Sequence, residues 1–229
     1  LIRMDIDHLI VGGVRTINLS RIALARMMVM DSDMARRGKL ARPRVLVASN
    51  GSVIARYHSN AQFRADVKNA DLVDADGMPL VIASRLLCRK PLVERIATTD
   101  FIHDAASAAA EAAVRFYFLG GRAGVARRAA DALTGKHPGL QVVGVRHGYF
   151  SSSEEDEICT DILARKTDVL WIGMGSPSQE ALAIRFREKL PGVAWIRTCG
   201  GLFDHVSGAV PRAGQWMQAM GLEWLHRTL

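Results

Sequence analysis

The sequence predicts an α/β fold of the Rossmann-like type, with a mostly parallel sheet and helices on both of its faces. Short apolar runs with strand character alternate along the chain with amphipathic stretches of helical spacing. Strands joined through intervening helices need right-handed crossovers, which place them in parallel. No Pro/Ser-rich linker, charge block or repeat with a period of roughly 20 to 50 residues divides the chain, so a single domain over residues 1–229 is the simplest organisation.

The first predicted elements lie between Ser20 and Asp74. Ser20 is placed to cap a helix, because apolar residues follow it at helical spacing and Gly38 closes the pattern. Residues 44–49 have the composition of a short buried strand, polar helical sequence continues through Asn69, and a second strand-like run ends near Asp74. Residues 1–43 are expected to form an N-terminal strand and helix segment packed on the core.

The second half of the chain continues the alternation. Strands are expected at 115–119, 140–145, 168–172 and 193–197, and helices at 125–134, at 154–166, after Pro177 and from Ala213. In open parallel sheets, ligands bind beyond the carboxyl ends of the strands. The loops that follow these strands are therefore the places to look for chemistry.

Composition narrows the class of protein. A chain with 49% hydrophobic and 23% charged residues is expected to fold, which excludes disorder. Cys88, Cys159 and Cys199 are odd in number and contain no CxxC, so we expect neither a disulfide framework nor a zinc ribbon, but a reducing, cytoplasmic compartment. No apolar run approaches the roughly 18 to 20 residues of a membrane span, and no signal peptide is expected.

The net charge of +7 is carried mainly by arginine, since only six of the 30 basic residues are lysine. A basic surface suits nucleic acid, anionic lipid or a nucleotide diphosphate, and charge alone does not choose among them. The histidines form no HExxH, no GxSxG elbow is present, and no RNP-like strand or DNA-reading helix accompanies the basic residues. Metalloenzyme, hydrolase and nucleic-acid-binding functions are thereby disfavoured.

Polar residues follow the first two strands. Asn50 either caps the next helix, which is the default, or points its amide at a substrate hydroxyl. Asp74 and Asp76 share a face in extended chain, a spacing that suits a divalent cation, as in the DxD of many nucleotide-sugar transferases. Alternatively, one of them caps a helix while the other acts as a general base toward a sugar hydroxyl, or both form a plain cap and turn.

Glycine-rich loops follow three later strands. Gly120 and Gly121 stand between a strand and a helix, where bare amides can approach a phosphate. The loop is neither a Walker A motif nor a complete dinucleotide fingerprint, so NAD binding is not expected. Residues 173–180 also join a strand to a helix, and Gln179 is one of their polar residues that face the strand ends. The start of a helix alone would explain several of these residues. Asp204 follows the last strand, where it either accepts hydrogen bonds from a sugar or caps a turn.

Read in order, several sequence blocks resemble the WecG/TagA/CpsF glycosyltransferases. They are DGMPL at 76–80, FLGG at 118–121 with GVA at 124–126, GYF at 148–150, GMGSP at 173–177 with QE at 179–180, GGLFD at 200–204, SG at 207–208, RA at 212–213 and GLEW at 221–224. The resemblance covers roughly residue 44 to the end. Ordered blocks together are much more specific than any one of them.

The resemblance implies an inverting transferase that needs no essential metal or other cofactor. It would move N-acetylmannosamine or a related hexose from a UDP-sugar to a polyprenyl-diphosphate-linked saccharide at the inner face of the cell membrane, for cell-envelope or extracellular polysaccharide. Asp76 is implied as the general base. Asn50, Arg95, Gln179 and Asp204 are implied to line the substrate pocket, with Arg95 offering charge to a diphosphate. The expected partners are these substrates and the membrane surface, and a homo-oligomer is left open.

Departures from the family pattern keep an alternative open. Ala48 stands where a threonine is common, Gly214 stands where a proline is usual, and Asp74 is an unusual addition. We expect the C-terminal basic appendage of the family to be absent after Leu229. Trp216, Met220 and Trp224 share one helical face, which suits the core, a second subunit or lipid. The alternative function is a non-catalytic nucleotide- or anion-binding module that partners a polysaccharide assembly complex.

Overall fold

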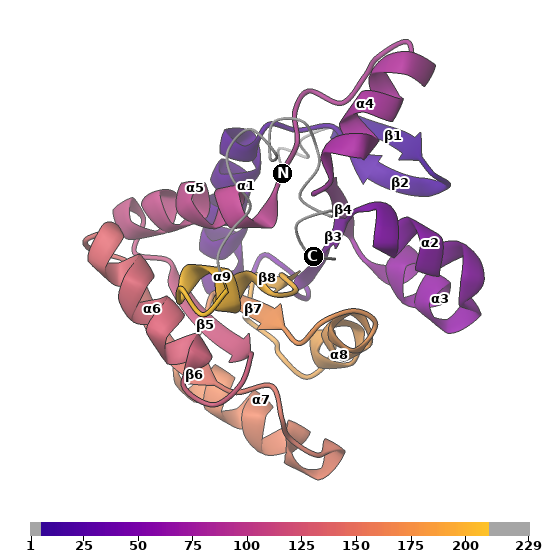
Figure 1. Ribbon diagram of the computed structural model, residues 1–229. Coiled ribbons are helices and arrows are strands. Elements are labelled where there is room, and N and C mark those ends of the chain that lie inside the picture. Colours follow the sequence, from indigo (N-terminus) through magenta and orange to yellow (C-terminus); the bar gives the residue numbers. More distant parts are fainter. Residues whose placement is uncertain (1–5, 211–229) are drawn as a thin grey trace.

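The computed structural model describes residues 6–210, whose centre is a six-stranded, entirely parallel sheet (Figure 1). The strand order is β4-β3-β8-β7-β5-β6. The strands are β3 (Arg44–Ser49), β4 (Leu72–Ala75), β5 (Arg115–Gly120), β6 (Gln141–Arg146), β7 (Val169–Gly173) and β8 (Trp195–Thr198). The predicted α/β fold with a parallel sheet is confirmed.

Helices cover both faces of this sheet (Figure 1). One face carries α1 (Arg21–Arg36), α5 (Thr98–Glu111), α6 (Val125–Lys136) and α9 (Leu202–Val206), and the other carries α2 (Gly51–Ser59), α3 (Ala61–Asn69), α7 (Glu155–Ala164) and α8 (Ser178–Arg187). Along β5, Phe116 and Phe118 join the first core, whereas Tyr117 and Leu119 join the second, because successive side chains of a strand point to opposite faces. Burial on both faces explains the unbroken apolar runs.

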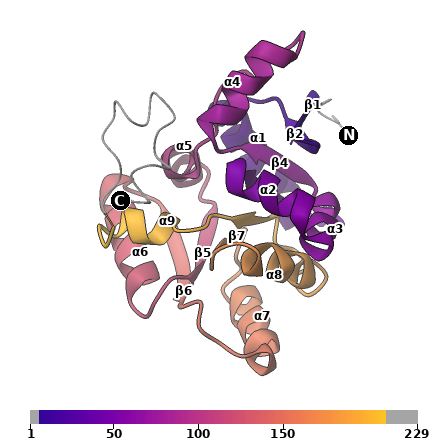
Figure 2. The same cartoon turned by 45° about the vertical axis from the view of Figure 1, so that its right-hand side comes forward.

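The N-terminal segment and the region after β4 contain elements that the sequence analysis did not resolve. The strands β1 (His8–Val11) and β2 (Val14–Ile17) form an antiparallel hairpin that turns at Gly12 and Gly13, both with positive φ. Helix α4 (Met78–Leu87) projects from the body of the protein (Figure 2), and α5 follows it before the chain enters β5. The helix predicted from Ala213 and its aromatic face lie outside the described residues.

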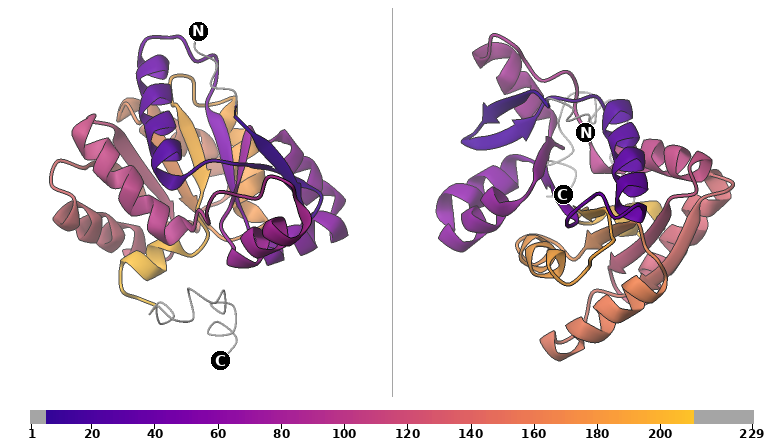
Figure 3. Two further views of the ribbon diagram at one scale, coloured as in Figure 1. Left: turned by 90° about the horizontal axis from the view of Figure 1, so that it is seen from above. Right: turned by 180° about the vertical axis from the view of Figure 1, so that it is seen from behind.

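The carboxyl ends of the six strands lie at one edge of the sheet, since all of the strands are parallel. Helices α4 and α9, which follow β4 and β8, lie at this same end (Figure 3, left). The loops that bear the predicted site residues are thereby collected at one edge. Within residues 6–210, the helices are too short or too polar to cross a bilayer.

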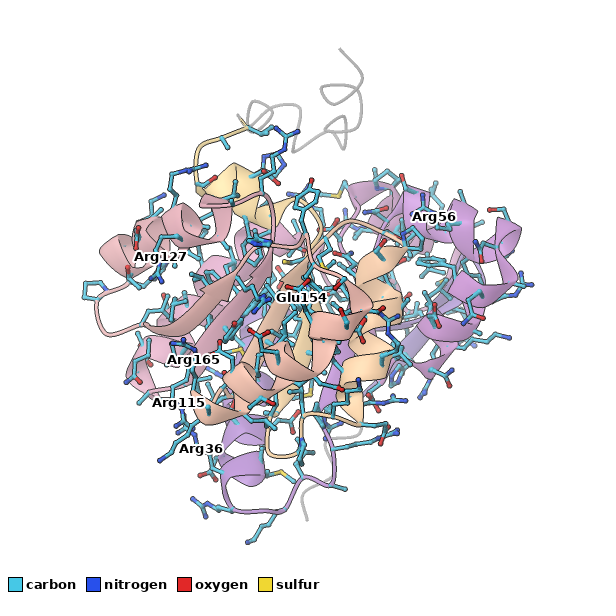
Figure 4. The ribbon with its side chains drawn as sticks, turned by 90° about the horizontal axis from the view of Figure 1, so that it is seen from below. Arg36, Arg56, Arg115, Arg127, Glu154 and Arg165 are labelled. Carbon is cyan, nitrogen blue, oxygen red and sulfur yellow. The ribbon has the colours of Figure 1, made fainter. Side chains whose placement is uncertain are left out.

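A charged cluster lies at the opposite, amino end of the sheet. Asp168, just before β7, accepts hydrogen bonds from Arg36 of α1 at 2.6 Å and from Arg115 of β5 at 2.9 Å, and Figure 4 shows these two arginines close together. Burial by itself raises the pKa of Asp168, but hydrogen bonds from Arg36 and Arg115 outweigh it and leave the pKa below its usual value. The cluster fastens α1 to the sheet.

Candidate active site

Asp76 lies directly after β4, half-buried, with both carboxylate oxygens hydrogen-bonded. The backbone N–H of Thr98, at the start of α5, donates to Oδ1 at 2.7 Å, and the side-chain amide of Asn50 donates to Oδ2 at 3.3 Å. The N–H of Asp76 donates to the carbonyl of Ser49 at 2.8 Å, which links the loop after β4 to the end of β3. The donors fix the carboxylate, and each oxygen keeps a further lone pair for a proton.

Asn50 serves as a helix cap and as the partner of Asp76 at the same time. Its Oδ1 accepts hydrogen bonds from the N–H groups of Ser52 and Val53 at 3.1 and 3.2 Å, which caps α2. Its Nδ2 is thereby directed to Asp76. The capping interpretation is confirmed, and the cap itself aims the amide toward the carboxylate that the sequence singled out.

Asp74 has a different task from Asp76. It is fully buried, and its Oδ2 accepts a hydrogen bond of 2.5 Å from Arg197 on β8. Burial raises the pKa of Asp74 to about 6, although Arg197 opposes the shift. Because this carboxylate is paired with a buried guanidinium, it is poorly placed to share a cation with Asp76, which argues against the DxD interpretation.

Arg197 and Thr98 are residues that the sequence analysis missed. Arg197 also donates to Oγ1 of Thr98 at 3.3 Å, and its guanidinium lies 5.1 Å from the centre of the Phe101 ring. The buried ion pair therefore supports the residue whose N–H holds Asp76. The available signal was a charged residue inside an otherwise apolar strand, which needs a partner when buried.

Arg95 lies in the segment between α4 and α5, close to the end of β4. The N–H of the following residue, Ile96, donates to the carbonyl of Ala75 at 2.8 Å, which fixes this segment beside the carboxyl edge. The mostly buried guanidinium of Arg95 forms a salt bridge of 3.2 Å with Asp100 of α5. Arg95 thus belongs to the Asp76 side of the sheet edge.

The ends of β5 and β7 approach so closely that Gly120 admits no side chain. Its φ is +148°, and a Cβ there would lie 2.1 Å from the carbonyl oxygen of Gly173. The N–H of Gly121 donates to that same carbonyl at 2.9 Å, and the N–H of Gly148 donates to the carbonyl of Gly121 at 2.9 Å. The loops after three strands are linked through their backbones.

A cleft of about 780 Å³ opens over these glycines. Its lining includes Gly121, Gly148, Gly173, Gly175, Gly200, Gly201, Arg122, Arg128, Tyr149 and Asp204. Two exposed arginines and the N-terminus of α6 supply positive charge, and bare glycine backbone allows close approach. The cleft has the size of a small-molecule site and the chemistry of an anion site. Arg122 and Arg128 were not among the predicted residues, although Arg122 stands inside the glycine-rich loop.

Gln179 lies beneath this cleft and does not line it. Its buried Oε1 accepts a hydrogen bond from the N–H of Gly200 at 2.9 Å, while its Nε2 donates to Glu180 at 2.8 Å. Burial raises the pKa of Glu180, although the hydrogen bond from Gln179 opposes the shift. Gln179 thus fastens the loop after β8 to the start of α8, where it supports the wall that carries Asp204.

The predicted site residues therefore fall into two groups along one sheet edge. Asp76, Asn50 and Arg95 lie on the β3–β4 side, whereas the glycine loops, Gln179 and Asp204 lie on the β5–β7–β8 side. Strands β4 and β7 are three places apart in the sheet, which corresponds to about 14 Å between the ends of these two strands, whereas β3 and β8 are neighbours. A ligand that touches both Asp76, after β4, and the glycines after β7 has to be extended.

Comparison with known proteins identifies a family. A family model described as the glycosyl transferase WecG/TagA/CpsF family matches residues 14–229. A curated relative from Bacillus spizizenii, N-acetylglucosaminyldiphosphoundecaprenol N-acetyl-beta-D-mannosaminyltransferase, is 28% identical over 184 residues, which cover 80% of this chain and 70% of the relative. Among solved structures, a nicotinate phosphoribosyltransferase from Vibrio cholerae matches 84% of this chain and 49% of its own, at 14% identity and a TM-score of 0.25.

Proposed function

Because the chain belongs to the WecG/TagA/CpsF family of glycosyl transferases, we propose that it moves N-acetylmannosamine or a related hexose from a UDP-sugar to a lipid-diphosphate-linked acceptor sugar. Family membership gives the class of enzyme. The relative from Bacillus spizizenii, named for the transfer of N-acetylmannosamine to N-acetylglucosaminyldiphosphoundecaprenol, supports the choice of sugar and acceptor. The reaction would take place at the inner surface of the cell membrane, where such a lipid is presented, and its product would serve polysaccharide synthesis.

The separation between Asp76, after β4, and the glycines after β7 supports a UDP-sugar as the donor. In the proposed complex, the diphosphate lies over the glycine loops, near Arg122 and Arg128, and Asp204 accepts hydrogen bonds from the nucleoside or the sugar. The hexose then extends toward the β3–β4 side and Asp76. The spacing of about 14 Å between the ends of β4 and β7 suits an extended nucleotide diphosphate sugar better than a lone phosphate.

In the proposed mechanism, Asp76 is the general base. Its carboxylate takes the proton of the acceptor hydroxyl while that oxygen attacks the anomeric carbon of the donor. The bond between the anomeric carbon and the diphosphate oxygen breaks, and its electron pair leaves with UDP. Attack from the side opposite the leaving group inverts the configuration. The positive charge of the cleft offsets the charge on the departing diphosphate, so we propose no essential metal ion.

This proposal depends on the position of Asp76, which two hydrogen-bond donors hold at the carboxyl end of β4. The variant Asp76→Asn tests it. With radiolabelled UDP-N-acetylmannosamine and a lipid-linked acceptor analogue, we expect a fall in kcat of about 10²- to 10⁴-fold. UDP affinity measured by calorimetry should remain close to that of the unchanged protein. Asp131→Asn, on the exposed side of α6, is the matched control. Full turnover by Asp76→Asn would remove the base role.

A further inference from the structure

Helix α4 ends in an exposed apolar surface. Leu86 and Leu87, its last two residues, are 79% and 84% exposed. Ile82, one turn earlier, and Val93, on the returning segment, are also exposed. Within residues 6–210, no large apolar side chain is more exposed than these two leucines. We call residues 82–93 the α4 tip. An exposed apolar cluster of this kind on a folded protein indicates a surface that contacts another protein or a membrane.

The α4 tip is also purely basic. Arg85, Arg89 and Lys90 are exposed, and residues 78–93 contain neither Asp nor Glu. Within the described part of the chain, none of the three forms an ion pair, in contrast to the many arginines elsewhere that bind a carboxylate. Long basic side chains beside leucines are the usual composition of a surface that lies at the level of lipid headgroups.

The tip stands at a defined place relative to the proposed catalytic residue. Helix α4 begins at Met78, two residues after Asp76, and projects away from the sheet (Figures 1 and 2). Pro79 in its first turn favours this helix start. A helix of ten residues is about 15 Å long, so Asp76 lies at the base of the helix and the leucines lie at its far end.

We infer that the α4 tip docks on an anionic lipid bilayer, with Leu86 and Leu87 at headgroup depth and Arg85, Arg89 and Lys90 against lipid phosphates. A second copy of the tip is the less suitable occupant, because two tips face to face would bring two sets of unpaired cations together, whereas an anionic bilayer supplies both an apolar layer and negative charge. Docking itself does not depend on the proposed reaction. If that reaction is correct, the docked helix holds Asp76 near the membrane surface, where a lipid-linked acceptor presents its sugar.

Vesicle binding tests the docking surface. Sedimentation of the 229-residue protein with vesicles should show binding when they contain phosphatidylglycerol, weaker binding to pure phosphatidylcholine, and loss of binding as salt rises. Leu86→Ser with Leu87→Ser should lower the partition coefficient at least about tenfold. The matched control is Ile22→Ser with Met30→Ser, two exposed apolar residues of α1, which should bind like the unchanged protein.

A second pair of variants tests the contribution of the basic residues to membrane binding. Arg89→Glu with Lys90→Glu should lower binding to anionic vesicles about tenfold or more. Arg26→Glu with Lys39→Glu changes the net charge by the same amount at exposed positions outside α4, and it should lower binding much less. Because all of these side chains are exposed, thermal unfolding should be nearly unchanged in every variant.

Cys88, inside the α4 tip, offers an independent readout. It is half-buried, whereas Cys159 and Cys199 are buried, and burial raises the pKa of the Cys159 thiol to about 11. A polarity-sensitive maleimide should therefore label Cys88 first. Its emission should shift to the blue on addition of anionic vesicles. The same label in a protein with Cys88→Ser and Ser153→Cys, on the exposed turn before α7, should not shift.

Three results would overturn the inference: no binding of the unchanged protein to anionic vesicles, unchanged binding by the leucine variant, or a leucine variant that turns a dimer into a monomer while vesicle binding persists. Failure of the proposed function is distinguishable from these. It would appear as an absence of sugar transfer to both a short water-soluble acceptor and a membrane-embedded one, with vesicle binding intact. If both proposals hold, the leucine variant should lose turnover only with the embedded acceptor.

Discussion

At the scale of single residues, Asn50 links the local folding of α2 to the proposed catalytic carboxylate. One side-chain oxygen accepts from the first N–H groups of α2, and the amide nitrogen of the same side chain donates to Asp76. Asn60 caps α3 in the same way, through the N–H of Phe63 at 2.9 Å, but has no carboxylate partner in the described residues. A comparison of substitutions at these two caps can therefore distinguish an effect on stability from an effect on catalysis.

We expect Asn50→Ala and Asn60→Ala to lower the free energy of unfolding by a similar amount, about 1 kcal/mol each. Asn50→Ala should in addition lower kcat/KM about tenfold or more, because it frees one oxygen of Asp76, whereas Asn60→Ala should leave kcat/KM unchanged. Urea denaturation and the transfer assay measure the two effects. Equal activity of the two variants would show that the Asn50–Asp76 contact has no part in turnover.

At Gly120, the backbone geometry determines how much a substitution destabilises the protein. Gly120→Ala should be strongly destabilising, by several kcal/mol, because the new methyl group would overlap the carbonyl of Gly173 and the φ of +148° is strained for alanine. Gly135→Ala, in α6 with open space around its Cα, should instead stabilise the protein by about 0.5–1 kcal/mol. Thermal unfolding of both variants measures the contrast. A mild effect of Gly120→Ala would mean that β5 and β7 can separate.

Sequence pattern predicted some of these residues because their signals are local. Asn50, Asp76 and Gly120 each follow a strand-like run, so their position at the carboxyl edge could be argued in advance. Arg197 could not be paired with Asp74, because 123 residues separate them and their contact depends on both reaching across one face of the sheet. The roles of Arg95, Gln179 and Asp204 in substrate binding stay predictions.

At the scale of elements, strands β3 to β8 were predictable to within about two residues, since most of them are buried on both faces and have unbroken apolar runs, whereas the edge strand β6 is only partly buried. Their order in the sheet was not predictable, because periodicity reports that a strand exists and not which strand lies beside it. The β1–β2 hairpin carried a readable turn signal at Gly12 and Gly13. Helix α5 lay in a segment that the sequence analysis left unassigned.

The fastening of α1 to the sheet gives a pH prediction. Asp168 has a lower pKa in the folded chain than the value of about 3.9 expected after unfolding. The stabilisation is therefore fully present above that unfolded value and is lost as pH falls through the lower, folded pKa. Asp168→Asn should cost about 3 kcal/mol at neutral pH, since it leaves two arginines without their carboxylate. The variant should also lose stability less steeply on acidification.

Chemical denaturation between pH 7 and pH 2 measures both effects. Asp33→Asn is the matched control, because Asp33 forms an exposed pair with Arg37, the residue directly after α1, and such pairs contribute about 0.5 kcal/mol or less. If Asp33→Asn and Asp168→Asn were equally mild, the Asp168 cluster would not be what holds α1 in place.

At the scale of the whole molecule, ligand binding to the cleft should be visible as global stabilisation. UDP at 100 times its Kd should add about 2.7 kcal/mol, a rise in Tm of roughly 5–10 °C for a domain of this size. Uridine without phosphates should give a much smaller rise. Arg128→Ala should reduce the UDP effect because Arg128 lines the cleft, whereas Arg127→Ala, which lines a separate hollow next to α7, should not. Equal shifts for both variants would place UDP elsewhere.

The two ends of the sheet also differ in how freely their amino-acid sequence can change. Asp168 and its arginines secure the scaffold at the amino end, while the glycine loops and Asp76, which we propose to meet substrate, lie at the carboxyl end, on the far side of the core. If the proposed function is correct, evolution can therefore reshape sugar preference by exchanging loops without loosening the framework that carries them. The same separation gives the protein engineer a scaffold on which donor selectivity and thermal robustness can be selected in independent libraries.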